Sequence, residues 1–211
     1  MKKILSLCFL ATSIVYAQEI AYSPYLDETS TVKFSVPYTL GTHEGKATNI
    51  VGETKIDLKK MKVSSARFRI NLDSIRMGKD KLDCHFQETL GLDYATSDFP
   101  KKHVCDGKNK LPTSGKNALA YPEIEFVLKN QIPGPTPDSV IVTGEWAIHG
   151  QKKETTFPVQ ISKDPAKPTV VVLDGTTTFK LADFGLTVKS MLGISVKDPI
   201  TVKIHLALAQ K

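Results

Sequence analysis

The sequence has few cysteines, a single tryptophan and none of the short motifs that mark the common enzyme classes. Three of its 211 residues are cysteine, and a chain of this length buries enough apolar surface to fold without disulfide bonds. A Gly-x-Ser-x-Gly elbow, a His-Glu-x-x-His pair, a phosphate-binding glycine loop and a Cys-x-x-Cys pair are all missing. The hydrophobic fraction of 41% and the charged fraction of 24% exclude collagen-like, low-complexity and wholly disordered classes.

Long apolar runs are also scarce. The one such run spans residues 4–15, follows two lysines, and is succeeded by a Val-Tyr-Ala sequence that ends at residue 17. These are the features of a secretory signal peptide, and Cys8 follows a leucine rather than a small residue, which argues against a lipoprotein signal. We therefore predict that residues 1–17 are removed and that 18–211 form one domain, located in the periplasm or secreted. No other segment approaches the roughly 18 apolar residues of a transmembrane helix.

Positive charge is in modest excess and is not concentrated. The formal net charge is +6, and removal of residues 1–17, which hold two lysines and no acids, leaves +4. The remaining lysines are scattered, as at Lys101-Lys102 and Lys152-Lys153, without a basic stripe that includes aromatic residues. Nucleic acid is therefore not expected as a partner, whereas a weak, transient attraction to anionic head groups at a membrane surface stays open.

The mature chain keeps two cysteines, Cys84 and Cys105, and such a pair in an exported protein is typical of a disulfide bond. The bond would close a loop of about 22 residues and stabilise the fold by about 3 kcal/mol in the chain-entropy model. Because His85 adjoins Cys84 and His103 lies two residues before Cys105, a zinc or copper site is an alternative. Adjacent side chains diverge on a helix or strand, which favours the disulfide over the metal. Free thiols are the third alternative.

Apolar residues alternate with polar residues along most of the chain, which is the pattern of strands with one buried face. The alternation predicts about eight strands in an antiparallel sandwich or up-and-down barrel. The last stretch has small residues on its second face, so we expect it to close a barrel or to be buried against a partner. A turn is expected at Gly150-Gln151-Lys152. The alternating stretches are 31–38, 47–58, 66–72, 124–128, 140–149, 155–161, 170–180 and 200–209.

Two segments interrupt this pattern. Residues 79–91 place apolar side chains at spacings of three and four, which predicts a short helix that packs on the sheet or plugs one end of it. From about residue 94 to 119 the composition turns to Asp, Lys, Asn, Pro and Gly, which predicts one long inserted loop. The disulfide, if formed, would tie this loop to the helix.

Five short motifs in this order resemble a known family. They are Ser30-Thr31-Val32-Lys33-Phe34-Ser35-Val36, Asp83-Cys84-His85-Phe86, Tyr121-Pro122-Glu123-Ile124-Glu125-Phe126, Gly144-Glu145-Trp146-Ala147-Ile148-His149-Gly150 and Asp183-Phe184-Gly185. Together they are similar to the YceI-like family of exported, lipocalin-like barrels that bind polyisoprenoid or other long-chain lipids. The resemblance implies an all-β, antiparallel, eight-stranded, lipocalin-like up-and-down barrel with a short helix and one inserted loop.

The chain departs from the family at four positions. Thr29 and Tyr38 stand where the family usually has histidines, and Leu82 and Leu181 stand where it usually has arginines. If those basic residues hold an anionic head group in the family, their replacement argues against a diphosphate ligand. The resemblance then favours a neutral quinone, an amide or a fatty acyl chain.

The predicted interior of the barrel has large apolar side chains and two glycines. An eight-stranded barrel is just wide enough to be filled by its own side chains or to hold one slender ligand. Because Gly52 and Gly144 fill no space, the lining could enclose a tunnel, although the same side chains could form an ordinary core. The candidate ligand-binding residues are Phe34, Val36, Phe68, Ile70, Phe126, Trp146, Ile148, Phe157, Val159, Phe179, Ile204 and Leu206.

Four further candidates lie near the expected mouth. Asp83 and His85 on the short helix could bond the polar head of a ligand, or could cap a turn and pair with the backbone. Phe184 and Met191 belong to a segment that could form a flexible lid, because methionine adapts to irregular apolar surfaces, or could close the core.

These observations favour a non-enzymatic carrier that takes a polyisoprenoid, quinone, fatty acyl or amide chain from the membrane surface into the barrel. Each buried methylene would gain about 0.8 kcal/mol, and no cofactor, metal or covalent step is required. The alternatives are a solid barrel whose inserted loop binds a protein and, with least support, an enzyme using aspartate and histidine. His149 and His205 are expected at the surface. The family resemblance and the partly apolar outer face of the last strand are compatible with a homodimer.

Overall fold

The computed structural model describes residues 19–25, 30–79, 121–186 and 196–211, together with Leu82, Asp83, Phe86 and Leu90. These residues form a ten-stranded antiparallel sheet and two short 3-10 turns. The elements are β1 (Ile20–Pro24), β2 (Thr31–Tyr38), β3 (Gly41–Ala47), β4 (Ile50–Asp57), β5 (Lys62–Asn71), η1 (Leu72–Ser74), β6 (Glu123–Pro133), β7 (Ser139–Ile148), β8 (Gln151–Lys163), β9 (Val170–Phe179), η3 (Leu181–Phe184) and β10 (Ile200–Gln210).

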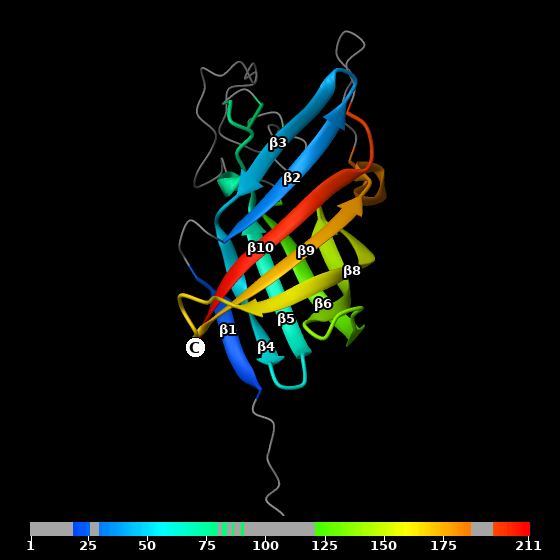
Figure 1. Ribbon diagram of the computed structural model, residues 1–211. Helices are drawn as coiled ribbons and strands as arrows, with labels where there is room; N and C mark the ends of the chain where they lie inside the picture. The colour runs from blue at the N-terminus through cyan, green and yellow to red at the C-terminus, as the bar shows by residue number, and fades with distance from the viewer. Residues whose placement is uncertain are drawn as a thin grey trace, which may run out of the picture.

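Eight of these strands close into a barrel (Figure 1). Strands β4 to β10 pair in chain order, and β1 lies between β4 and β10, which completes the ring. This confirms the predicted antiparallel, up-and-down barrel. The β2–β3 hairpin is not part of the closed ring but continues its wall. Strand β2 pairs with residues 201–205 of β10, while β1 pairs with residues 208–210 along the same edge of β10.

Side chains alternate between the inside and the outside of the barrel along each strand. In β7, the residues at even positions from Val140 to Ile148 are buried, while Ile141, Thr143, Glu145 and Ala147 are more exposed. Successive side chains of a strand point to opposite faces of the sheet, so one face of every strand turns inward. The buried apolar side chains of the described strands, except Val170 and Ala207, belong to one cluster. The interior of the barrel and the hydrophobic core are therefore the same space.

The alternating stretches of the sequence correspond to β2 and to β4 through β10, but β1 and β3 do not follow from alternation. The sequence of β3 is Gly-Thr-His-Glu-Gly-Lys-Ala, and most of it is exposed. It forms because β2, its neighbour in the chain, pairs with it along its whole length. Strand formation depends on such cross-strand partners as much as on the residue types.

The turn between β7 and β8 lies one residue earlier than expected from the sequence. His149 and Gly150 have φ angles of 52° and 73°, as in the two-residue type I′ hairpins that match the twist of a sheet. Gln151, which was expected in the turn, pairs with Ile148 and begins β8. The ring of His149 contacts that of Tyr121, with centroids 4.5 Å apart, so this histidine lies at the tip of the hairpin.

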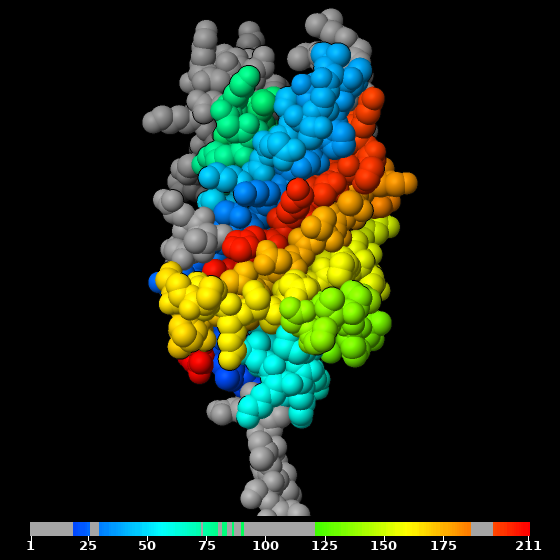
Figure 2. All heavy atoms as spheres, in the orientation of Figure 1, coloured from blue at the N-terminus to red at the C-terminus, as the bar shows by residue number. Residues whose placement is uncertain are grey.

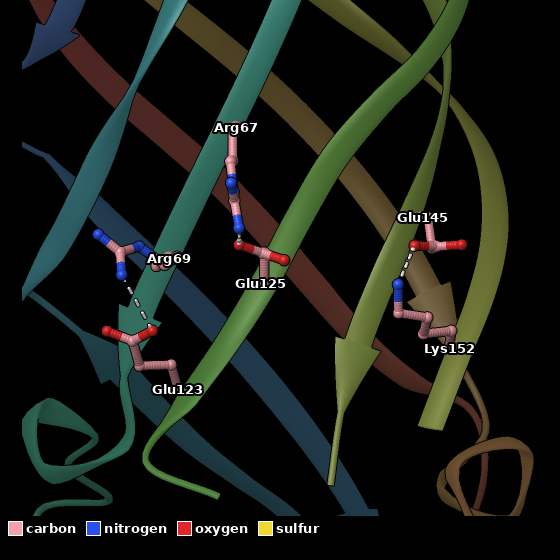
Figure 3. A network of polar contacts seen from close by, with 6 residues as sticks. All are labelled: Arg67, Arg69, Glu123, Glu125, Glu145 and Lys152. Carbon is pink, nitrogen blue, oxygen red and sulfur yellow. Dashed lines mark hydrogen bonds and ion pairs between the residues drawn. The ribbon is translucent and has the colours of Figure 1, made fainter. Parts of the chain in front are cut away.

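Charged side chains on the outer face pair across neighbouring strands (Figure 3). The hydrogen bond that Arg67 donates to Glu125 raises the pKa of Arg67, and the hydrogen bond that Glu145 accepts from Lys152 lowers the pKa of Glu145. Exposed pairs of this kind stabilise a fold only slightly, and here they mark the solvent side of β5 to β8. The N···O distances are 2.7 Å for Arg67–Glu125, 3.3 Å for Arg69–Glu123 and 3.0 Å for Lys152–Glu145.

The end of β10 is covered by the chain itself. The Ser30 hydroxyl accepts a hydrogen bond from the Ala207 N–H and donates one to the Ala207 carbonyl, both at 3.0 Å. The Tyr25 N–H donates to the same carbonyl at 2.7 Å. Ala207 is buried as a result. The last strand thus closes the barrel, and no partner is needed to cover its small residues. Homodimerisation stays a prediction.

Four described residues belong to the expected short helix. Leu82, Asp83, Phe86 and Leu90 are helical, and no helix of the described residues is long and apolar enough to cross a membrane. The signal peptide and the inserted loop at about 94–119 fall outside the described residues. So do Cys84, His85, His103, Cys105 and Met191. The disulfide, metal and free-thiol alternatives therefore stay predictions.

Candidate ligand-binding site

The barrel encloses two apolar cavities. The first has a volume of about 70 Å³ and is bounded by β2 and by β4 through β10. The second has a volume of about 40 Å³ and lies toward the end of the barrel that carries the short helix, because Phe86 and Leu90 contribute to its lining. Every described residue that lines either cavity is apolar. Cavities of this kind stay free of water and take up apolar molecules.

Three side chains separate the two cavities. Val32 of β2, Ile70 of β5 and Trp146 of β7 line both of them. Among the described residues no others line both cavities, so these three side chains lie between them as a partition.

Trp146 is the tryptophan of this sequence and occupies the centre of the site. Its ring centroid lies 4.9 Å from that of Phe126, and its indole N–H donates to the Thr155 hydroxyl at 3.1 Å. The one polar atom of the indole is therefore satisfied inside the wall, and the rest of the ring presents apolar surface to both cavities. A bound ligand would touch this ring, which makes its fluorescence a direct reporter of binding.

Glycines let the aromatic rings lie flat against the wall. A Cβ atom on Gly144 would lie 2.2 Å from the ring of Phe126, and a Cβ on Gly52 would lie 2.1 Å from the Arg67 carbonyl and 2.9 Å from the Phe68 ring. The φ angle of Gly52 is also 148°, a conformation that side chains disfavour. Because the rings occupy the space above these glycines, they leave the axis of the barrel less filled.

Aromatic contacts close the end of the second cavity. Phe86 stacks on Phe34 with centroids 4.9 Å apart, and Phe184 of η3 meets the edge of Phe179 at 5.4 Å. Phe184 is completely buried and does not line either cavity. Its position is that of a residue that closes the core behind the lining.

Asp83 is engaged by its own segment of the chain. Its carboxylate is buried, accepts a hydrogen bond from the Met77 N–H, and lies 3.9 Å from the Arg76 guanidinium. These contacts hold the segment that leads from β5 into the helix. The geometry is that of local capping, the second of the two roles considered for this residue.

The predicted site residues gather around the two cavities, with five exceptions. The first cavity is lined by Phe68, Ile70, Phe126, Trp146, Phe157, Val159, Ile204 and Leu206. The second is lined by Phe34, Ile70, Trp146, Ile148 and Phe179. Val36, Phe184 and Asp83 are buried but line neither cavity. His85 and Met191 lie outside the described residues.

Several aliphatic members of the lining are absent from the predicted site residues. Val32, Val142 and Leu173 share the inward face with the residues that were chosen, so the same alternation could have identified them. Phe86 and Leu90 could have been found from their spacing of four in the helical segment. The choice favoured large aromatic side chains, whereas any inward residue bounds the lumen.

A row of three lysines crosses the outer face of β3, β2 and β10. Lys33 stands directly opposite both Lys46 and Lys203, and all three are exposed. They border a depression of about 890 Å³ on the face where β2, β10 and β9 run side by side (Figure 2). In the described part of the chain none of them forms an ion pair, and like charges directly opposite each other destabilise a sheet.

A histidine–aspartate pair borders the same depression. His205 Nδ1 lies 2.7 Å from Asp174 Oδ1, and both side chains are about half exposed. A nucleophilic site would also need a hydroxyl or thiol bonded to the histidine, and within the described residues His205 has no such contact. No three His, Cys, Asp or Glu side chains of these residues are grouped as metal ligands would be.

Several solved structures share this fold. BcnA of Burkholderia cenocepacia is similar over 87% of this chain and 98% of its own, with a TM-score of 0.65 and 20% identity. The YceI protein of Campylobacter jejuni is similar over 80% of this chain and 85% of its own, with a TM-score of 0.57 and 15% identity. A polyisoprenoid-binding domain from Saccharophagus degradans, implicated in plant cell wall breakdown, is similar over 91% of this chain and 99% of its own. Its TM-score is 0.56 and its sequence identity is 15%.

Sequence comparison identifies the family. No curated protein sequence matches this chain significantly. The family model of the YceI-like domain matches residues 25–105 and 114–208, which together make up most of the chain and include β2 and β4 to β9 of the site. The match agrees with the order of the short motifs and with the closed antiparallel barrel. This chain therefore belongs to the family of proteins with a YceI-like domain.

Proposed function

We propose that this protein is a non-enzymatic carrier that holds one long-chain apolar ligand inside the barrel, in the periplasm or outside the cell. The observation that carries the proposal is the pair of cavities lined only by apolar residues and separated by three side chains. The polyisoprenoid-binding domain from Saccharophagus degradans, which has a similar fold, supports a lipid as the ligand. The signal peptide predicted from residues 1–17 supports export.

Binding requires the partition to open. A hydrocarbon chain would displace Val32, Ile70 and Trp146 and occupy both cavities as one channel. Each methylene removed from water contributes about 0.8 kcal/mol, which opposes the cost of ordering the chain and moving the partition. Binding of this kind requires no covalent step.

The ligand we propose is uncharged within the barrel. Among the described residues no cationic side chain lines either cavity, and a charge buried without a partner costs far more than one hydrocarbon chain gains. The replacement of the family's histidines and arginines by Thr29, Tyr38, Leu82 and Leu181 leads to the same conclusion. A quinone, a fatty amide or a fatty acyl compound fits better than a diphosphate.

We propose that the lysine row formed by Lys46, Lys33 and Lys203 makes the transient contact with the membrane. Its charges lack partners within the described part of the chain, and anionic head groups would relieve their mutual repulsion. Lys33 lies between Val32 and Phe34, which line the cavities from the other face of β2. The contact would therefore hold the barrel wall against the surface from which the ligand leaves.

Native mass spectrometry of the purified protein, with extraction and identification of any released compound, tests the proposal. The matched variants are Ala66→Leu, which fills the first cavity from β5, and Ala147→Leu, which adds the same atoms to the outer face of β7. We expect a stoichiometric lipid in the wild type and in Ala147→Leu. In Ala66→Leu we expect affinity to fall about tenfold or more, because overpacking competes with the ligand.

Titration of the same proteins with lipids, followed by Trp146 fluorescence, gives the affinity directly. A wild-type protein that contains no lipid and whose fluorescence does not respond to quinone, isoprenoid or fatty amide would contradict the carrier. Equal binding by both leucine variants would place the ligand outside the barrel. Either result would favour the solid barrel that binds a protein partner.

A further inference from the structure

One buried hydroxyl inside the barrel lacks a hydrogen-bond partner. Six polar or charged side chains are buried in the described part of the chain. Five of them have partners: Ser30 bonds Ala207, Thr54 bonds the Ser65 carbonyl, Asp57 bonds Lys59 and Lys60, Asp83 bonds Met77, and Ser139 bonds Thr136. The sixth, Thr177, is 5% exposed, and its hydroxyl has no partner within these residues.

Thr177 faces the lumen between the two cavities. It lies in β9 two residues after Gly175, which lines the first cavity, and two before Phe179, which lines the second. Residues two apart share one face of a strand. Its cross-strand neighbour on β10 is Val202, which also lines the second cavity. Thr177 thus lies on the inward face of β9 between residues that line the two cavities, and it lines neither of them itself.

The wall is also interrupted at this point. The β8–β9 ladder ends where Val159 pairs with Gly175, so Thr177 has a strand neighbour on the β10 side alone. A backbone carbonyl of β8 does not approach it across a ladder. The lack of a partner is therefore consistent with the end of the β8–β9 ladder before Thr177.

A buried hydroxyl without a partner destabilises a fold, and in native proteins such a group is usually explained by a water, an ion or a ligand. A lone water would need two to four polar partners, and the residues around Thr177 on this face are apolar. A ligand atom is the remaining partner of suitable chemistry. An uncharged oxygen satisfies the hydroxyl without burying a charge.

We infer that Thr177 recognises the ligand of the proposed carrier by donating a hydrogen bond to an uncharged carbonyl oxygen that has apolar groups on both sides. This assignment rests on the proposed function and specifies its ligand class. A chain that carried its oxygen only at one charged end would leave Thr177 unpaired, whereas a ketone, an ester or a quinone places a neutral oxygen beside apolar segments.

Two probes of equal chain length distinguish the contribution of the carbonyl group to the binding affinity from that of the hydrocarbon chain. The first is 8-pentadecanone, which has a carbonyl in the middle of the chain, and the second is pentadecane. Binding to the full-length mature protein is measured by Trp146 fluorescence for the wild type, Thr177→Val and Thr54→Val. The control Thr54 is also a buried inward threonine of a ring strand, but its hydroxyl already bonds the Ser65 carbonyl at 2.8 Å.

We expect Thr177→Val to weaken the ketone about tenfold, as for the loss of one neutral hydrogen bond, and to leave the alkane unchanged. Thr54→Val should leave the preference between the probes unchanged. In the ligand-free protein, Thr54→Val should lower the urea midpoint, whereas Thr177→Val should leave it unchanged or raise it, because valine removes an unpaired hydroxyl and keeps the branched shape.

Two results would overturn the assignment while leaving the carrier intact. One is that Thr177→Val weakens both probes equally or neither. The other is that it lowers the urea midpoint as Thr54→Val does, which would show that the hydroxyl has a partner in the free protein. A wild-type protein that binds neither probe would remove the proposed function and the assignment together.

Discussion

Gly144 and Phe126 show how one missing side chain shapes the barrel wall. The ring of Phe126 occupies the space above Gly144, where a Cβ would lie 2.2 Å from it. The same ring contacts Trp146 at 4.9 Å and Phe157 at 5.9 Å. Any group added at Gly144 therefore moves a ring that lines the first cavity, and its effect reaches the ligand site.

We predict that Gly144→Ala lowers the free energy of unfolding by about 1–3 kcal/mol, the usual cost of overpacking. The control is Gly175→Ala, another inward glycine of the lining, where the added Cβ would meet Phe157 and Val159 at 3.4 Å. That contact is ordinary, so the control should change stability by less than about 1 kcal/mol. Urea unfolding of both variants checks the difference, and equal losses would contradict the role given to the Phe126 ring.

At the scale of elements, the barrel depends on how two strands share one edge of β10. Strand β1 pairs with residues 208–210 of β10, and β2 pairs with residues 201–205. Between them Ala207 pairs with neither strand, and Ser30 and Tyr25 satisfy its backbone groups. Ser30 therefore acts as a link that seals the ring at the junction of the two strands.

Ser30→Ala is expected to cost about 1–3 kcal/mol of stability, because it leaves the buried N–H of Ala207 without a partner. The Ala207 amide should also exchange its hydrogen faster, since the opening would be local. Ser35→Ala is the matched control: its hydroxyl bonds Glu44 at 2.8 Å in an exposed position, and its loss should change stability by about 0.5 kcal/mol or less. Unchanged exchange at Ala207 would exclude the sealing role.

At the scale of the whole molecule, charge is distributed unevenly between the faces of the barrel. The outer face of β5 to β8 has lysines and arginines paired with glutamates. The face of β3, β2 and β10 has Lys46, Lys33 and Lys203 side by side without such pairs in the described part of the chain. Because the protein has a net positive charge and the lysines of this face are unpaired among the described residues, electrostatic attraction would orient the lysine row toward an anionic surface.

The triple variant Lys33→Glu, Lys46→Glu, Lys203→Glu should bind vesicles that contain phosphatidylglycerol about 100-fold more weakly, at about 1 kcal/mol for each lysine. Lys62→Glu, Lys153→Glu, Lys163→Glu changes the net charge equally at exposed positions elsewhere and should retain most of the binding. Cosedimentation at low and high salt measures both. Equal losses in the two variants would indicate that net charge alone governs the contact.

The lining of the site was largely predictable, because one periodicity specifies it. Phe68, Phe126 and Trp146 belong to different alternating stretches, and closure of the sheet brings their inward faces together. Asp83 illustrates the opposite case. Its position near the mouth followed from the sequence, but its engagement by Met77 and Arg76 depends on how the segment after β5 folds back.

The alternation of apolar residues by itself determined the antiparallel barrel and the inward set of side chains, because a strand turns every second residue to the same face. Only the tertiary structure decided which edges meet, where Trp146 divides the lumen and which hydroxyl stays unpaired. These features depend on contacts between residues far apart in the chain, such as Ser30 and Ala207, and no local pattern encodes such a pairing. They arise when strand order and register are fixed together by closure of the ring.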